Sequence, residues 1–430
     1  MYNNYMKCLL QFFFCKKEGN MKLQENVKIL HYDNKVIYAN SNNGTWVRTS
    51  NEVAMIIDLL LKSKINSIEE EVEFDSEEDK EYFTHVVNDL KACNILVEDN
   101  NIFPDSPNLI IFETTNRCNL RCTHCSAAAG EDNEKELDTA EVKKILDRCI
   151  EWNPELIALS GGEPLFRKDF FEILQYLRER FHKNIGLNTN GLLINQQNVH
   201  KICESVQQID ISIDGVNEET CSIYRGKGVF EKVMKTIDLL HDTGFNNISL
   251  SMVFTDKNEH LKDEFTELNR RLGTHPVYRL LSAKGRAETN KDILTNVAEE
   301  ECYIPKSFIE DGSEEGTGVS TCQAGIKSIM IRYNGDVYPC PSYSPYEDYL
   351  MGNVRNVNSI CELTGQNMLK SVQDNMYRTN RMYHGGCVEC PVKLFCFSCP
   401  GGPYSYASDK VFEEYCKVSK AVLMKRVWGV

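Results

Sequence analysis

The stretch that decides the fold is Asn116-Arg-Cys-Asn-Leu-Arg-Cys-Thr-His-Cys125, in which Cys118, Cys122 and Cys125 follow a C-x3-C-x2-C spacing. The apolar run Leu109-Ile-Ile-Phe112 lies just before it and predicts a buried strand. Three thiolates on one short loop can hold three corners of a four-iron cubane, which normally has four cysteine ligands. The fourth iron would then be open. A zinc site is the alternative, although structural zinc ligands usually come as two close pairs.

Four further short motifs lie at or after predicted strands. Ser160-Gly-Gly-Glu-Pro164 follows the apolar run Leu156-Ile-Ala-Leu159, and Asn188-Thr-Asn-Gly191 ends a third strand. Asp210-Ile-Ser-Ile-Asp-Gly215 forms the fourth strand, and Tyr224-Arg-Gly226 comes next. A carboxylate suits an ammonium ligand because of its opposite charge. The two glycines beside it let backbone carbonyls approach a ligand closely. Each motif alone is weak evidence for a ligand site, but four such motifs in this order are unlikely to occur by chance.

The cysteine triad and these motifs, in this order, resemble the signature of the radical S-adenosylmethionine (SAM) enzymes. The resemblance implies that the thiolates of Cys118, Cys122 and Cys125 are catalytic and bind a [4Fe–4S] cluster whose open iron takes SAM. It also implies contacts to the amino group, ribose and carboxylate of SAM, with His124 framing the adenine through its backbone. The residues implied in these contacts are His124, Gly161, Gly162, Glu163, Asn190, Ser212, Asp214 and Arg225.

Charge and composition exclude some partners. A net charge of −15 over 430 residues argues against nucleic acid, because its phosphates would be repelled. No apolar run approaches the roughly 20 residues of a membrane span. The apolar run at residues 8–15 has no cleavage site after it, so we expect no secretion signal, and Met21 is a candidate start. Many of the 18 cysteines fall in close groups, which favours metal ligation in a reducing, anaerobic cytoplasm.

Residues 22–103 predict a small separate domain. Val27–Leu30 and Lys35–Ala39 flank the turn signal at Asp33 and predict a hairpin, and two amphipathic segments and a short strand follow. Strands, three helices and a returning strand resemble the winged-helix element that binds leader peptides in peptide-modifying enzymes, where a peptide can add to the sheet edge. The alternatives are a winged helix docked only for stability and a DNA-binding domain, which the acidic run from residue 69 to 81 disfavours.

Residues 105–310 predict alternating strands and helices. Strands are expected near 109–113, 156–160, 185–189, 208–213, 247–254 and 277–282, and helices starting near Thr139, Asp169, Asn195, Phe230 and Asn258. Such alternation builds a parallel sheet covered by helices, and six units fall short of the eight that close a full barrel. We therefore expect an α/β fold, a partial (β/α)6 TIM-like barrel, with the motifs at the carboxyl ends of its strands.

Residues 311–430 contain a second cysteine pattern, Cys322-x12-Gly335-x4-Cys340 followed by Cys387-x2-Cys390-x5-Cys396-x2-Cys399 and Cys416. It resembles the SPASM extension of the family, a cysteine-rich iron–sulfur domain. The resemblance implies two auxiliary [4Fe–4S] clusters, three clusters in all: Cys387, Cys390, Cys396 and Cys416 ligate one completely, and Cys322, Cys340 and Cys399 ligate the other. The alternative is a zinc-ribbon-like knot. Upstream of Cys322, Cys302 is a disfavoured fourth ligand, so that cluster is expected to have an open iron. The C-terminal residues 418–430 predict a helix that packs on the barrel.

The resemblance also implies the chemistry. A flavodoxin or ferredoxin would reduce the triad cluster, and SAM cleavage would yield a 5′-deoxyadenosyl radical that abstracts hydrogen from the substrate. Near an auxiliary cluster, the carbon radical can be captured by a thiolate held on iron. We therefore expect a maturase of ribosomally made precursor peptides that forms Cys thioether crosslinks, as in the sactipeptide (subtilosin-type) branch.

Three alternatives stay open. Anaerobic sulfatase-maturing (formylglycine-forming) enzymes share the barrel and clusters, but that branch has an acidic residue after the cysteine matched by Cys340, where this chain has Pro341. It also lacks the N-terminal domain. A peptide carbon–carbon crosslinking enzyme or epimerase would use the same clusters. A non-catalytic electron-transfer protein would have no reason to keep Glu163, Ser212 and Arg225 in SAM-binding order.

Overall fold

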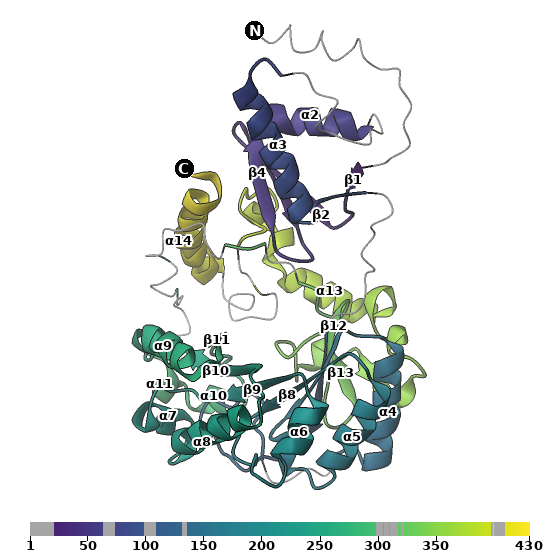
Figure 1. Ribbon diagram of the computed structural model, residues 1–430, viewed down its shortest axis with the longest axis vertical. Coiled ribbons are helices and arrows are strands. Elements are labelled where there is room, and N and C mark those ends of the chain that lie inside the picture. The colour runs from purple at the N-terminus through teal and green to yellow at the C-terminus, as the bar shows by residue number, and fades with distance from the viewer. Residues whose placement is uncertain are drawn as a thin grey trace.

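The computed structural model describes residues 21–62, 74–98, 109–130, 136–297, 304, 309, 317–319, 322–396, 399 and 409–430. Residues 1–20, the first part of the acidic run and Cys302 lie outside these ranges, so the expectations placed on them stay predictions. The N-terminal domain lies at one end of an elongated molecule and the parallel sheet at the other, with α13 (Lys370–Thr379) and α14 (Asp409–Trp428) between them (Figure 1).

Six parallel strands form the centre of the larger body and follow one another across the sheet in chain order. They are β6 (Leu109–Thr115), β7 (Leu156–Gly161), β8 (Asn184–Thr189), β9 (Gln208–Ser212), β10 (Ile248–Phe254) and β11 (His275–Leu280). The connecting helices are α4 (Thr139–Glu151), α5 (Phe170–Arg180), α6 (Val199–Ser205), α7 (Glu218–Arg225), α8 (Val229–Asp242) and α9 (Lys262–Leu272). Each predicted strand is present with small shifts at its ends, which confirms the partial (β/α)6 barrel.

Apolar side chains at helical spacing hold these helices on the sheet. For example, α4 begins at a capping box made by Asp138 and Glu141 and buries Val142, Ile145 and Leu146 against the strands. The sequence did not predict α7, which is short and begins at a second capping box, at Asn217. This helix matters for the site because its last residue is Arg225.

The sheet continues beyond the barrel strands. β12 (Ser328–Ile331) pairs in parallel with β6, and β13 (Asp336–Tyr338) and β14 (Gly352–Asn353) extend the sheet in antiparallel fashion. The first part of the cysteine-rich region is therefore built onto the barrel sheet. β13 runs antiparallel to β12, and its last residue, Tyr338, pairs with Met330, so Cys340 follows toward the amino end of β6, opposite the end at which the triad loop begins.

The N-terminal domain contains the predicted hairpin, which is confirmed as β2 (Val27–Tyr32) and β3 (Lys35–Asn40). The third strand of its antiparallel sheet, β4 (Trp46–Ser50), was not predicted. Two helices, α2 (Asn51–Lys62) and α3 (Glu77–Ala92), lie in the described part of the domain, where the sequence suggested three. β1 (Met21–Leu23) pairs with β5 (Leu96–Glu98), and the core between sheet and helices includes Val36, Tyr38, Ile57, Phe83 and Leu90.

The C-terminal helix α14 corrects one expectation, because its apolar side chains do not join the barrel core. Leu423, Val427 and Trp428 instead form a separate apolar cluster with one face of the N-terminal sheet and with the cysteine-rich loops. Trp428 is fully buried, and its ring lies 5.6 Å from that of Tyr32. The buried face of the N-terminal sheet offers this helix more complementary apolar surface than the barrel, whose outer layer is already formed by its own helices.

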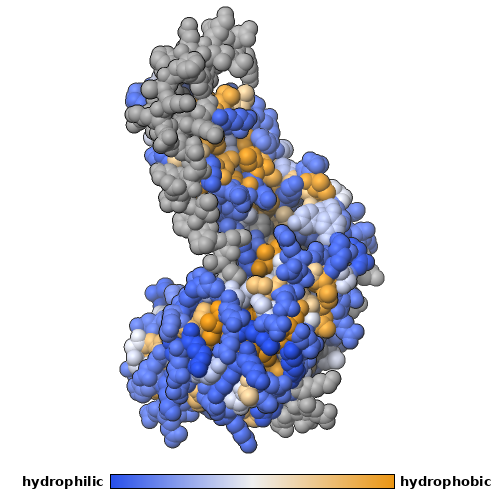
Figure 2. All heavy atoms as spheres, turned by 90° about the vertical axis from the view of Figure 1, so that its right-hand side faces the viewer, coloured by the Kyte–Doolittle hydropathy of each residue, from blue (hydrophilic) through white to orange (hydrophobic). Residues whose placement is uncertain are grey.

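Among the described residues no helix is long and apolar enough to cross a bilayer. Figure 2 shows a mostly hydrophilic surface over the face of the barrel that lies on the right-hand side in Figure 1. The remaining short helices that bear on the site are α10 (Arg286–Thr289) and α11 (Lys291–Leu294).

Candidate active site

The triad loop leaves the carboxyl end of β6 and is closed at its base by backbone hydrogen bonds. Cys118 N donates to the Gly130 carbonyl and Gly130 N to the Asn116 carbonyl, both at 2.9 Å. Burial raises the pKa of Cys118 to about 11, and charge on Cys122 and Cys125 raises it as well. Thiols held this way become thiolates only when a metal centre compensates their charge.

N–H groups face two of the three sulfurs. The Cys118 sulfur accepts from Leu120 N at 3.4 Å and lies 3.9 Å from Asn190 Nδ2. The Cys122 sulfur lies 3.9 Å from Arg225 Nη1. Hydrogen bonds of this kind to ligating sulfurs are among the contacts by which proteins set the potential of an iron–sulfur cluster.

Gly161 and Gly162 join the end of β7 to the triad loop. A Cβ on Gly161 would lie 2.2 Å from the Thr115 carbonyl oxygen, and a Cβ on Gly162 would lie 2.4 Å from that of Arg117. Gly162 N and Glu163 N donate to these same two carbonyls at 2.8 Å. The sequence assigned these glycines to the close approach of a ligand; in the structure they first permit the close approach of two backbone segments.

Glu163 is fully buried, and its carboxylate accepts hydrogen bonds from inside the fold. Thr189 Oγ1 donates at 2.8 Å, Asn190 N at 2.7 Å and Leu165 N at 3.1 Å. Burial raises the pKa of Glu163 to about 7, and these donors act in the opposite direction. The carboxylate thus ties the end of β7 to the end of β8 and helps to position Asn190. The expected contact of Glu163 to the amino group of SAM stays a prediction.

Asp214 holds two of the predicted SAM contacts in place. Its carboxylate accepts from Arg225 Nε at 2.5 Å, His124 Nε2 at 2.9 Å and Val253 N at 2.6 Å. Burial by itself would raise the pKa of Asp214, but Arg225, His124 and the hydrogen bond from Val253 N outweigh it and hold the pKa well below its usual range. Burial likewise opposes the charge of Arg225, and Asp214 and Cys122 raise its pKa nonetheless. The expected contact of Asp214 to the ribose stays a prediction.

Ser212 and Asn190 complete the predicted set. Ser212 is half-buried at the end of β9, with its hydroxyl 3.4 Å from that of Ser251. Asn190 Nδ2 donates to Asn119 Oδ1 at 2.8 Å, which ties the end of β8 to the triad loop. Of the two residues expected at the ribose, Ser212 is therefore the one with the less engaged side chain among the described residues.

The side chains present fit a four-iron cluster and SAM. His124 Nδ1 is buried, and no described group hydrogen-bonds to it, so the pocket has a polar atom that a ligand can satisfy. No three His, Cys, Asp or Glu side chains of the described residues lie close enough to share a single metal ion. A cubane spreads its thiolates over separate irons, so its ligands stand farther apart than those of a zinc ion.

A second segment, which the sequence did not single out, braces the triad loop from outside. Arg286 N donates to the Cys125 carbonyl at 3.0 Å, and its side chain donates to the Cys122 carbonyl at 2.9 Å and the Ala129 carbonyl at 2.8 Å. A Cβ on Gly285, which has a φ of +56°, would lie 2.6 Å from the Ser126 carbonyl oxygen. No short motif marks this segment, because its role depends on a contact more than 150 residues away.

The cysteines of the first auxiliary group gather around Ser342. The Cys399 sulfur lies 4.0 Å from Ser342 Oγ, and Ser342 also hydrogen-bonds to Cys340. Burial raises the pKa of Cys322 to about 11, and charge on Cys340 and Cys399 raises it as well. The structure thus brings together the three thiols that the sequence grouped, and their ligation of a cluster stays a prediction.

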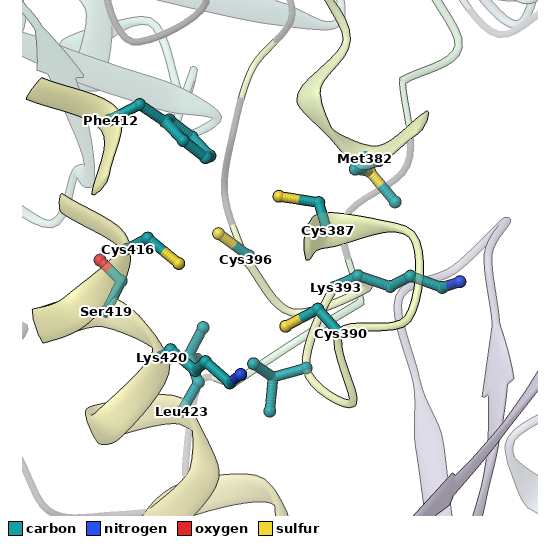
Figure 3. A pocket seen from close by; sticks show the side chains of 11 residues that line it. Met382, Cys387, Cys390, Lys393, Cys396, Phe412, Cys416, Ser419, Lys420 and Leu423 are labelled. Atoms are coloured by element: carbon teal, nitrogen blue, oxygen red, sulfur yellow. The ribbon is translucent and has the colours of Figure 1, made fainter. Parts of the chain in front are cut away.

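The second auxiliary group surrounds a cavity shown in Figure 3. Cys387, Cys390 and Cys396 come from one loop and Cys416 from α14, and the four sulfurs point toward a shared space. Burial raises the pKa of Cys396 to about 11. The cavity also has apolar walls, including Met382, Val392, Phe412 and Leu423. A four-thiol cage with these walls fits a fully ligated cluster shielded from water.

A partial barrel with a cysteine triad at its mouth and two further cysteine groups beside it defines a radical SAM enzyme with an auxiliary iron–sulfur domain. Comparison with protein families agrees: residues 112–268 match the radical SAM superfamily, and residues 322–391 match the SPASM iron–sulfur cluster-binding domain. The chain belongs to the radical SAM superfamily, and its cofactors are SAM and iron–sulfur clusters.

Individual relatives point the same way. The mycofactocin maturase MftC of Mycolicibacterium smegmatis is 30% identical over 268 residues, which cover 58% of this chain and 68% of MftC. An AdoMet-dependent heme synthase of Nitratidesulfovibrio vulgaris is 28% identical over 343 residues, covering 71% of this chain and 90% of that enzyme.

Among solved structures, Streptococcus suis SuiB bound to SAM superposes with a TM-score of 0.52 at 15% identity, covering 91% of this chain and 99% of SuiB. SuiB bound to its precursor peptide SuiA gives a TM-score of 0.52 at 16% identity, and the match covers 90% of this chain and 96% of SuiB. These likenesses establish the fold.

Proposed function

We propose that this enzyme modifies a ribosomally made precursor peptide and forms thioether crosslinks from its cysteines. The observation that carries the proposal is the unequal pair of auxiliary groups: among the residues that the structure describes, one has four gathered thiols and the other three. A cluster held by Cys322, Cys340 and Cys399 alone would keep an iron open to a substrate thiolate. Such a thiolate is the sulfur source that a thioether needs.

The N-terminal domain supports a peptide substrate. β2 is an edge strand of its three-stranded sheet, and Ile29 on this strand is exposed. An extended leader peptide can pair with such an edge through main-chain hydrogen bonds. The names of MftC as a maturase and of SuiB as a binder of a precursor peptide point to the same substrate class.

The residues of the barrel would divide the work between binding and positioning. When bound, the cluster and SAM supply a 5′-deoxyadenosyl radical after one-electron reduction, for which we propose a flavodoxin or ferredoxin as donor in an anaerobic cytoplasm. Cys118, Cys122 and Cys125 would hold the cluster. Arg225, fixed by Asp214, would pair with the carboxylate of SAM, and Ser212 would contact the ribose.

Mass spectrometry of a modified peptide tests this proposal. The reconstituted full-length enzyme would be incubated anaerobically with SAM, dithionite and the peptide encoded by a short reading frame beside its gene. We expect a loss of two hydrogens per link, with the linked cysteines no longer alkylatable. The same loss with every cysteine still alkylatable would indicate carbon–carbon crosslinks instead. Unchanged mass with deuterium uptake from solvent would indicate an epimerase.

A matched variant separates the peptide chemistry from SAM cleavage. Cys399→Ala removes a ligand of the first auxiliary group and leaves the triad intact. We expect this variant to produce 5′-deoxyadenosine without the thioether. Unimpaired thioether formation by Cys399→Ala would contradict the proposed use of the open auxiliary iron.

A second candidate, favoured by the coverage of the heme synthase relative, is oxidative decarboxylation of a porphyrin, in which a propionate becomes a vinyl group as CO2 leaves, the SAM-derived radical takes one hydrogen atom and an electron acceptor takes one electron. Incubation with iron coproporphyrin III under the same conditions would produce heme if this candidate is correct. A porphyrin substrate would leave the exposed edge of the N-terminal sheet without a role. The sulfatase-maturing alternative keeps the objection that Pro341 follows Cys340, and it predicts formylglycine in a sulfatase-derived peptide.

A further inference from the structure

Lys284 is buried between the two cluster sites. It is 8% exposed, and its ammonium donates to the carbonyls of Ser342 and of Ser344, the latter at 3.1 Å. The ring of Tyr346 lies 4.4 Å from the ammonium. This single side chain therefore fixes the turn that follows Cys340, and Ser342 in that turn also contacts Cys399.

Two cysteine side chains lie close enough to this ammonium to interact with it electrostatically. Burial lowers the pKa of Lys284 to about 8, and charge on Cys340 and Cys399, both predicted ligands of the first auxiliary cluster, acts in the opposite direction. A buried ammonium is costly unless an anion compensates it. A cluster with thiolate ligands is such an anion, so the position of Lys284 fits a cluster at this group.

The neighbours of Lys284 in sequence contact the other site. Gly285 lies so close to the triad loop that an added Cβ would meet the carbonyl oxygens of Ser126 at 2.6 Å and Cys125 at 2.7 Å. Arg286 donates to the carbonyls of Cys122 and Cys125. Consecutive residues thus hold the auxiliary turn on one side and the triad loop on the other.

We propose that Lys284 is a positioning residue of the first auxiliary site, where its ammonium fixes the turn at residues 342–344 and supplies the positive charge that raises the reduction potential of the cluster on Cys322, Cys340 and Cys399. This inference rests on the proposed ligation of a cluster by those cysteines. A fixed positive charge favours the reduced, more negative form of a cluster, and hydrogen bonding and burial are the other protein contributions to its potential.

The test is an anaerobic redox titration, followed by electron paramagnetic resonance, of the full chain. Cys118, Cys122 and Cys125 are replaced by Ala in the parent so that only auxiliary signals remain. In Lys284→Met we expect one auxiliary signal to become at least tenfold harder to reduce at equilibrium, a shift of about 59 mV to lower potential for a one-electron couple. The second auxiliary signal, from the group containing Cys416, should stay in place.

Two controls make the result specific. Lys284→Arg keeps the charge and should restore the potential to within threefold of the parent. Lys327→Met removes a lysine of equal exposure, 8%, whose ammonium donates to Asn42 Oδ1 at 2.9 Å in the N-terminal domain, and it should leave both signals unmoved.

Several outcomes would overturn the proposal. Both auxiliary clusters present in Lys284→Met with unmoved potentials would contradict it, as would equal loss of one cluster in Lys284→Met and Lys284→Arg. Absence of auxiliary iron and sulfide in the parent would overturn the proposed cluster sites themselves. That failure is distinguishable because it is seen before any lysine variant is measured.

Discussion

The triad loop and the four-thiol cage of Cys387, Cys390, Cys396 and Cys416 both gather thiols, but the fold holds them in opposite ways. Hydrogen bonds hold the triad loop: its base is closed by backbone pairs, and Arg286 and Asn190 attach it to neighbouring segments. Apolar packing holds the cage, whose cysteines lie beside Val392, Phe395 and the buried end of α14. The two sites should therefore respond to different mutations.

The difference teaches that the N-terminal domain supports one site and not the other. Its sheet contributes Leu30, Ile37 and Ala39 to the apolar cluster around the cage. Trp46 donates to the Thr317 carbonyl at 2.6 Å, and Arg48 donates to the Val427 carbonyl at 2.6 Å. Within the part of the chain that the structure describes, the triad loop hydrogen-bonds to the barrel and to the segment at residues 284–290.

The largest expected effect is that of Cys122→Ala. Removal of one of three ligands should abolish production of 5′-deoxyadenosine by the reduced enzyme and remove about four irons per chain, one cubane. The cage and the first auxiliary group should keep their iron, because their contacts do not involve Cys122. Iron analysis and chromatography of the SAM products measure both effects, and iron lost from all sites together would contradict the separation.

Removal of residues 1–103 should come next. The deletion uncovers one face of the apolar cluster, so we expect weaker peptide binding, reduced solubility and partial loss of iron from the cage, whereas SAM cleavage persists. Binding of a fluorescent leader peptide and the rate of 5′-deoxyadenosine production separate the two effects. Unchanged peptide affinity after truncation would count against a recognition domain.

Trp428→Ala tests the same packing with a single residue. Its ring is fully buried against Tyr32, and its Nε1 donates to the Pro391 carbonyl at 3.0 Å, so truncation should destabilise the cage region by about 3–5 kcal/mol. Thermal unfolding and iron content after gel filtration report the loss, and Trp428→Phe should recover much of it. Equal loss of triad iron would argue that the two sites share one packing unit.

Gly285→Ala should have the complementary, smaller effect on the triad. The new Cβ would meet the carbonyl oxygens of Ser126 at 2.6 Å and Cys125 at 2.7 Å, and the positive φ adds strain. We expect slower SAM cleavage and a weaker response of the triad cluster to SAM, with the cage unaffected. Gly244→Ala, which also has a positive φ but open space around it, controls for backbone strain alone.

The smallest effect concerns pH and Glu163. Since its pKa is raised to about 7 from an ordinary 4.5, the folded protein keeps this proton where the unfolded chain has lost it. The contribution to stability is therefore full below about pH 4.5 and is lost as the pH rises to about 7. Glu163→Gln should flatten this part of the curve of melting temperature against pH, and an identical slope in the variant would contradict it.

Much of this molecule could be predicted from its sequence. Apolar runs mark strands such as β6 and β10 because most of their residues are buried, although β11 is mostly exposed. Close cysteine spacing marks the triad, and the resemblance to the SPASM pattern groups the auxiliary cysteines. The inward role of the Glu163 carboxylate could not be predicted, since it depends on donors from the next strand. Lys284 and Arg286 carry no local pattern, and α14 lacks a single apolar face that would have shown where it packs.

The central claim, that Cys118, Cys122 and Cys125 hold a cluster with an iron open to SAM, is tested most directly by one measurement. It is the electron paramagnetic resonance spectrum of the dithionite-reduced protein with and without SAM. The account predicts that SAM changes one [4Fe–4S] signal and that this signal is absent from Cys122→Ala. Signals that do not change when SAM is added, or the same SAM-induced change in Cys122→Ala, would contradict the account.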